Sequence, residues 1–149
     1  MRVAVWRMLT LISLLLALGP AGCSRGPKLA PVKGTVTLKG RPLDNIMIEF
    51  IPDAPIGLRS TATTNEQGQH TLVCDDKRPG AIVGPHRVVL HDLGVYGGKF
   101  WGRKLENAGP KDGLKAPRIS DRYATAGQTP LQKEVKPEAQ TIDLEVMGP

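Results

Sequence analysis

The sequence has few cysteines, few aromatic residues and no apolar run long enough to cross a membrane. Its 149 residues include two cysteines, and aromatic side chains make up only 4%. The apolar run Met8–Leu18 is about half the roughly 20 residues that a transmembrane helix needs. A run of this length favours a signal peptide over a membrane anchor helix. The scarcity of aromatic residues indicates a core built mostly from Val, Ile and Leu.

Residues 1–22 have the order of parts expected of a signal peptide. Arg2 and Arg7 precede the apolar run, and small residues follow it. Removal of this segment lowers the formal net charge from +6 to +4, because it takes away the two arginines. A modest and dispersed positive charge suits a protein near anionic lipid or cell-wall polymer, and it is not the clustered charge of a nucleic-acid-binding protein.

The triplet Ala21–Cys23 resembles the lipobox of bacterial lipoproteins, in which small residues precede a cysteine whose thiol is diacylated. The resemblance implies a lipid on Cys23, with ordinary secretion as the alternative. Pro20 departs from the pattern, because the family favours Leu at that position and Leu18 is displaced. Ser24 follows the cysteine instead of Asp, which in well-studied Gram-negative bacteria favours export to the outer membrane. We therefore expect a lipid-anchored protein of the cell envelope, at the outer membrane and on its periplasmic or surface face.

A lipid on Cys23 leaves Cys74 as the sole remaining cysteine, so no internal disulfide is expected. Acyl chains contribute about 0.8 kcal/mol per buried methylene, and about two or three of them suffice to hold a protein at a membrane. Residues 23–31 are polar and contain proline, and they are predicted to form a short tether. The folded domain is expected to span residues 32–147.

The predicted domain is all-β. Alternating polar and apolar residues, the pattern of half-buried strands, occur in segments 32–40, 45–52, 59–64, 70–74, 84–92 and 140–146. The first two segments flank a Gly-Arg-Pro turn and are predicted to form a hairpin. The next two flank Asn-Glu-Gln-Gly and are predicted to form a second hairpin. No segment has a convincing helical period, so we expect an antiparallel β-sandwich of about seven strands.

The order of these motifs resembles the carboxypeptidase regulatory-like domain, a transthyretin-like (prealbumin-like) β-sandwich. The matching stretches are VKGTVTLKGRPLDNIMIEFIP, TATTNEQGQHTL and GAIVGPHRVVL. The likeness extends over nearly all of residues 31–146, and it is greatest to small lipoproteins of this type that are common in planctomycete bacteria. Asn65 stands where that family usually has Asp, and His70 where it has Phe or Tyr. The resemblance implies a similar fold with a less aromatic core.

The segment 120–135 fits neither a helical nor a strand period, and its place in the family pattern is the connection into the last strand. We predict a structural crossover in which Tyr123 packs its ring on the sandwich and its hydroxyl contacts backbone. Leu131 and Val135 are expected to fix the far end of the crossover.

Catalytic and metal-binding patterns are weak. His86 and His91 are five residues apart on one predicted strand, so they point to opposite faces and cannot share an ion without a bulge. His70 and Cys74 share a face but lie about 13 Å apart along a strand, too far for one metal. Cys74 falls at an inward position, where a thiol is usually inert. We expect no enzyme activity, no metal and no cofactor.

The segment 95–104 is the most distinctive one. It interleaves aromatic and basic side chains on a glycine-rich loop, namely Tyr96, Lys99, Phe100, Trp101, Arg103 and Lys104. Such residues suit stacking on sugar rings, contact with acidic polymers or interfacial contact with a membrane, or else the aromatic rings fold back and cover a sheet edge. The main hypothesis is a non-catalytic envelope lipoprotein whose β-sandwich is a binding or structural module, with an envelope polysaccharide or another envelope protein as partner. The alternative is carbohydrate or cell-wall-polymer binding through this loop.

Overall fold

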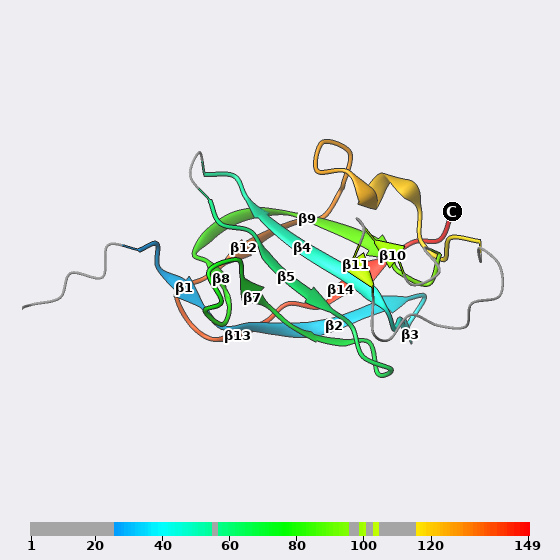
Figure 1. Cartoon of the computed structure of the whole chain (residues 1–149), viewed down its shortest axis with the longest axis horizontal. Helices are drawn as coiled ribbons and strands as arrows, with labels where there is room; N and C mark the ends of the chain where they lie inside the picture. The colour runs from blue at the N-terminus through cyan, green and yellow to red at the C-terminus, as the bar shows by residue number, and fades with distance from the viewer. Residues whose placement is uncertain (1–25, 55–56, 96–98, 101–102, 105–115) are drawn as a thin grey trace, which may run out of the picture.

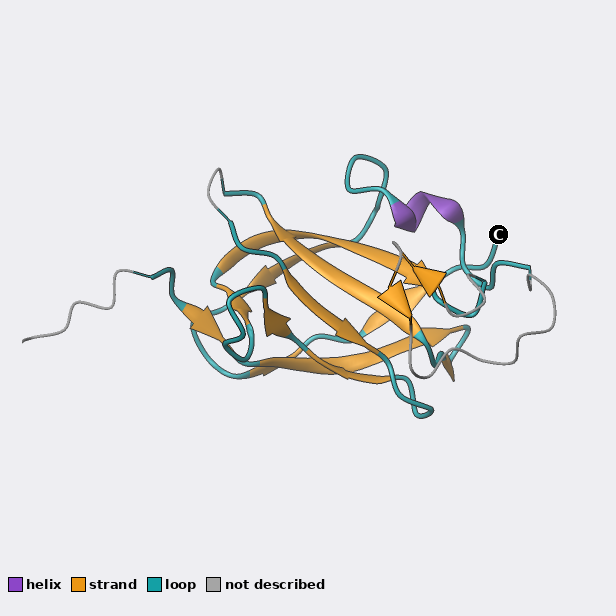
Figure 2. Ribbon diagram, in the orientation of Figure 1, coloured by secondary structure: helices purple, strands orange, loops and turns teal. Residues whose placement is uncertain are grey.

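Two β-sheets face each other across an apolar core in the computed structural model (Figure 1). The structure describes residues 26–54, 57–95, 99–100, 103–104 and 116–149. Nearly all regular structure among these residues is strand, and the short 3-10 helix η2 (Asp121–Ala124) is their only helix (Figure 2). The prediction of an all-β sandwich without a substantial helix is confirmed.

The larger sheet has five strands, and all neighbouring pairs in it are antiparallel. Its order is β12 (Gln132–Val135), β9 (Gly84–Asp92), β4 (Ile46–Pro52), β5 (Ser60–Thr63) and β7 (Val73–Cys74). The long β4–β9 pair forms its centre, with seven residues of β4 in register with seven of β9.

The second sheet is arranged around one central strand, β2 (Val32–Leu38). The antiparallel strands β3 (Arg41–Pro42) and β6 (Gln69–Thr71) pair along one side of it. The strands β13 (Gln140–Thr141) and β14 (Leu144–Val146) pair along the other side and run parallel to β2. Two short pairs complete the fold: β1 (Leu29–Ala30) with β8 (Ala81–Ile82), and β10 (Lys99–Phe100) with β11 (Arg103–Lys104).

The alternation in the sequence marks the buried faces correctly. Ile46, Ile48 and Phe50 of β4 are completely buried, as are Val36 of β2 and Val88 of β9. The remaining core residues at predicted inward positions include Val32, Leu90, Ile142, Leu144 and Val146, each no more than 8% exposed. Burial of one such side chain stabilises a fold by about 1.5–3 kcal/mol, so these two inner faces supply most of the driving force for folding.

The first predicted hairpin is wrong. β2 and β4 belong to different sheets, and β2 pairs instead with the two-residue strand β3. The chain then crosses to the larger sheet through Asn45, whose φ of 54° lies in the left-handed region that Asn tolerates. Periodicity failed here because it shows which face of a strand is buried and not which strand lies beside it. Both strands bury a face against the same core from opposite sides.

The second predicted hairpin is correct only in part. Asn65 forms the expected turn, and its side-chain oxygen accepts hydrogen bonds from the backbone N–H groups of Gln67 (3.0 Å) and Gln69 (2.9 Å). After this turn, β6 pairs with β2 of the other sheet, and only β7 returns to pair with β5. The chain changes sheets around Leu72, which is fully buried. A strand that switches sheets in this way closes a corner of the sandwich.

The crossover 120–135 is packed as predicted. Tyr123 lies in η2 and is 1% exposed, and its hydroxyl oxygen accepts a hydrogen bond from the N–H of Met147 at 3.1 Å. Val135 is 1% exposed, and Leu131 packs against the core. The crossover therefore ties the end of the chain beyond β14 to the larger sheet.

The amino-terminal part of the domain begins at β1, which lies within the segment 23–31 expected to be a tether. Residues 1–22 and Cys23 lie outside the described residues, so the predicted signal peptide and lipid acceptor are not part of the structural description. Within the described ranges, no helix has the length and apolar character needed to cross a membrane.

Candidate functional site

The predicted binding loop is described only in part. Tyr96 and Trp101 lie outside the described residues. The backbone of the loop forms the strand pair β10–β11, in which Lys99 is opposite Lys104 and Phe100 is opposite Arg103. The register thus places one aromatic and three basic positions on one two-stranded antiparallel pair.

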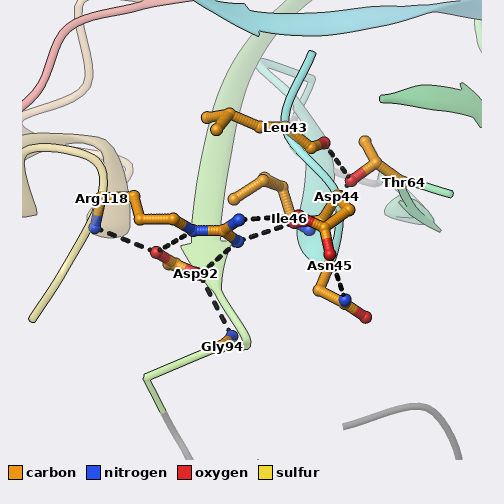
Figure 3. A network of polar contacts seen from close by, with 8 residues as sticks. All are labelled: Leu43, Asp44, Asn45, Ile46, Thr64, Asp92, Gly94 and Arg118. Carbon is orange, nitrogen blue, oxygen red and sulfur yellow. Dashed lines mark hydrogen bonds and ion pairs between the residues drawn. The ribbon is translucent and has the colours of Figure 1, made fainter. Parts of the chain in front are cut away.

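The most extensive polar network of the described residues is centred on Arg118 (Figure 3). Its guanidinium binds the carboxylate of Asp92 with two hydrogen bonds, from Nε to Oδ2 at 3.0 Å and from Nη2 to Oδ1 at 2.7 Å. It also donates from Nη1 to the carboxylate of Asp44 at 2.8 Å and from Nη2 to the Asp44 carbonyl at 2.7 Å. One side chain thereby joins the end of β9, the connection before β4 and the segment that leads into η2.

Burial differs sharply between the two carboxylates of this network. The Asp92 side chain is 4% exposed, whereas the Asp44 side chain is 44% exposed. Asp92 also accepts hydrogen bonds from the backbone N–H groups of Arg118 (3.0 Å) and Gly94 (3.1 Å). The hydrogen bond from Arg118 holds the pKa of Asp44 below its usual range, and Asp92 above all raises the pKa of Arg118. Two carboxylates and a carbonyl accept hydrogen bonds from four of the five guanidinium N–H groups, so Arg118 acts as a structural clamp.

A second cluster lies across the larger sheet on the face opposite to the core. Glu49 of β4 is 3% exposed and lies 3.2 Å from Arg59 Nη1 and 3.5 Å from His91 Nε2. Arg59 also lies 3.8 Å from Asp75. Hydrogen bonding by His91, followed by the charge of Arg59, holds the pKa of Glu49 below its ordinary value, although burial acts in the opposite direction. The cluster joins β4, the start of β5, the end of β7 and β9.

The histidine in this cluster is not one that the sequence pointed to. Of the three histidines, His91 is the one that the structure brings to Glu49, which also contacts Arg59. The opposite orientation of His86 and His91 on β9 is confirmed, because His86 contacts the core residue Phe50 at a ring separation of 5.7 Å. Within the described ranges, no group of three or more His, Cys, Asp or Glu side chains is placed to hold a metal ion.

His70 and His86 are core residues, with exposed fractions of 4% and 1%. The Nδ1 atom of His86 lies 2.9 Å from the carbonyl oxygen of Gly84, whereas its Nε2 has no hydrogen-bond partner. Neither ring nitrogen of His70 has one. Burial lowers the pKa of His70 to about 4, with Asp143 opposing the shift, and burial also lowers the pKa of His86. Both rings are therefore neutral core groups whose protonation disfavours the fold.

These two histidines predict an acid-sensitive stability. A group whose pKa is lower in the folded state stabilises the fold fully above its unfolded pKa, near 6.5, and loses that contribution as the pH falls toward the folded value. We expect His70 alone to lower the free energy of unfolding by about 2 kcal/mol between about pH 7.5 and about pH 5. Urea denaturation at these pH values measures the change, and most carboxylates stay ionised over this range.

The matched variant for this prediction is His70→Phe, which keeps a ring and removes the titrating group. Its stability should vary less with pH, and the remaining slope should report His86. A slope equal to that of the parent protein would show that His70 does not carry the acid sensitivity.

A groove of about 470 Å³ lies on the outer face of the second sheet, which is built around β2. Pro31, Pro79 and Gly80 line part of it. Lys33 lies in register with Thr71 of β6 on one side and with Thr141 of β13 on the other. All three of these side chains are exposed and line the groove. Cross-strand neighbours in register share a face of a sheet, so the side chain of Lys33 lies between those of Thr71 and Thr141 on the face that lines the groove.

The residues of the groove and of the Arg118 network were missed by sequence reasoning. Arg118, Asp92 and Asp44 are separated by up to 74 residues, and nothing in their local sequence distinguishes them from solvated loop charges. The row formed by Thr71, Lys33 and Thr141 depends on the register of three strands from different parts of the chain. Only the position of Lys33 on the outward parity of β2 was visible in the sequence.

Comparisons with known proteins give one distant structural match. No family model and no curated protein matches the sequence. A solved structure of a DUF3823 family protein from Parabacteroides merdae ATCC 43184 is similar in fold, with 11% sequence identity and a TM-score of 0.46. The match covers 83% of this chain and 48% of that chain, so this protein spans about half the length of the matched one. The likeness is one of fold alone and assigns no function.

Proposed function

We propose that this protein is a non-catalytic lipoprotein of the bacterial cell envelope, with a β-sandwich that serves as a binding or structural module. The observation that carries the proposal is the short distance between the candidate lipid acceptor and the first strand. β1 begins at Leu29, so residues 24–28 alone separate it from Cys23. At about 3.3–3.6 Å per residue, this segment spans at most about 18 Å. A lipid on Cys23 would hold the sandwich close to the membrane surface.

The burial and the ion-pair partners of the ionisable side chains support a non-catalytic role. Arg118 is engaged by Asp92 and Asp44, and His70 and His86 are enclosed in the core. The free thiol of Cys74 is also buried, at 1% exposure. A nucleophile or general base must reach a substrate, and these candidates point into the fold.

The order of the motifs in residues 31–146 favours the carboxypeptidase regulatory-like domain, and the two-sheet core agrees in general architecture with such a sandwich. In this interpretation, the module carries no chemistry of its own and acts by presenting surfaces to an envelope polysaccharide or another envelope protein.

The test is acylation of Cys23 in a bacterial host. We expect radiolabelled palmitate to be incorporated into the parent protein and to be lost completely in Cys23→Ser, because serine lacks the thiol that accepts the lipid. The matched control is Cys74→Ala, which removes the other cysteine and should retain the label. Absence of label in the parent protein, or its retention in Cys23→Ser, would contradict the lipoprotein proposal and favour ordinary secretion.

A further inference from the structure

We propose that the groove around Lys33 docks on the phosphate headgroups of anionic phospholipids, so that the sandwich contacts the membrane through a defined end. This inference extends the proposed function, because the lipid anchor would bring that end to the bilayer. The occupant of the groove is a headgroup phosphate at a lipid surface.

The position of the groove favours a contact with the membrane. Pro31 lines it directly after β1, and β13 contributes Gln140 and Thr141. β1, β8 and β13 lie together at one end of the molecule, whereas η2 and the carboxyl terminus lie toward the other end (Figure 1). The groove is therefore at the end where the chain enters the fold. The polar layer of a bilayer is about 5–7 Å thick on each side, so an anchor within about 18 Å places this end at the headgroups.

The positive charge around the groove favours an anionic lipid surface. Lys28, Lys33 and Lys136 surround this end, and none of them forms an ion pair with another described residue. Lys136 is held close to the groove, because Gln140 Nε2 donates to its carbonyl at 3.1 Å. Glu138 lies in the same connection and opposes this charge in part. Cations near an anionic lipid surface each contribute about 1 kcal/mol of attraction, which falls off within a Debye length.

The polar side chains that line the groove suit a phosphate group. The ammonium group of Lys33 is a point charge suited to phosphate, and the hydroxyls of Thr71 and Thr141 on either side are available hydrogen-bond donors. The proline and glycine walls carry no competing carboxylate. A phosphate can therefore approach Lys33 from solvent without displacing an existing ion pair.

The test uses residues 24–149 without a lipid, because the core residues in the described part of the chain lie between Ala30 and Val146. Co-sedimentation with vesicles of phosphatidylglycerol and of phosphatidylcholine measures partitioning at low salt. We expect binding to the phosphatidylglycerol vesicles alone, and about fivefold weaker partitioning for Lys33→Gln. Lys39→Gln is the matched control, because it removes the same charge from an exposed site just beyond the other end of β2, and it should bind like the parent.

The outcomes separate this proposal from its alternatives. Equal losses in the Lys33→Gln and Lys39→Gln variants would show diffuse attraction by net charge and would overturn the proposal. Binding to neither vesicle, or equally to both, would overturn it as well. The experiment contains no acylated protein, so its result is independent of Cys23. Absence of palmitate label in the parent protein, together with a positive vesicle result, would reject the anchor and keep the groove.

Discussion

Arg118→Ala is expected to lower the free energy of unfolding by about 3 kcal/mol. The variant leaves the carboxylate of Asp92, 4% exposed, without its guanidinium partner in the fold. Removing one member of a buried ion pair costs about 3–5 kcal/mol, because an uncompensated charge stays buried. The lower end applies here, since the backbone N–H groups of Gly94 and residue 118 continue to donate to Asp92. Urea denaturation at neutral pH measures the loss.

Two further variants test the physical cause of this loss. Asp44→Asn removes the exposed partner of the same guanidinium and should cost less than about 1 kcal/mol, as exposed ion pairs usually do. Asp92→Asn in the Arg118→Ala background removes the stranded charge and should recover part of the lost stability. If Asp44→Asn were as damaging as Arg118→Ala, the clamp would depend on the exposed pair, and the burial argument would be wrong.

The clamp also shows what the sequence could not predict. The spacing of Ile46, Ile48 and Phe50 predicts a buried face, because each lies two residues from the next. No comparable local rule links Asp44, Asp92 and Arg118, whose contacts depend on three loops arriving at one end of the sandwich. Ion pairs of long sequence separation are products of the tertiary fold, and their residues look like ordinary surface charges until the fold is known.

The pairing of strands was only partly predictable for a related reason. β2 and β4 both alternate correctly, yet they lie in opposite sheets. The parallel pairing of β13 and β14 with β2 also leaves no mark in the alternation. Gly34 depends on this arrangement, because a Cβ atom there would lie 1.9 Å from the carbonyl oxygen of Ile142. The glycine was visible in the sequence, but the need for a glycine at this position was not. That need comes from a close backbone approach, which only the strand order creates.

Tyr123, in contrast, was predictable, because it is the only aromatic residue in a segment without a regular period and must close the last crossover. Tyr123→Ala is expected to lower the free energy of unfolding by about 3–5 kcal/mol, the usual cost of truncating a buried aromatic residue. Besides the cavity, the variant leaves the N–H of Met147 without its acceptor. The loss is measured by urea denaturation at neutral pH.

Tyr123→Phe separates the packing of the ring from the hydrogen bond of the hydroxyl. It keeps the ring and should cost only about 1 kcal/mol, the usual contribution of one hydrogen bond. Amide exchange of Met147 should quicken in this variant while exchange in β4 and β9 stays slow, because only the tie beyond β14 is released. Should Tyr123→Phe destabilise the protein as much as Tyr123→Ala, the hydroxyl and not the ring would hold the crossover. A small effect of Tyr123→Ala would instead mean that the crossover does not close the core.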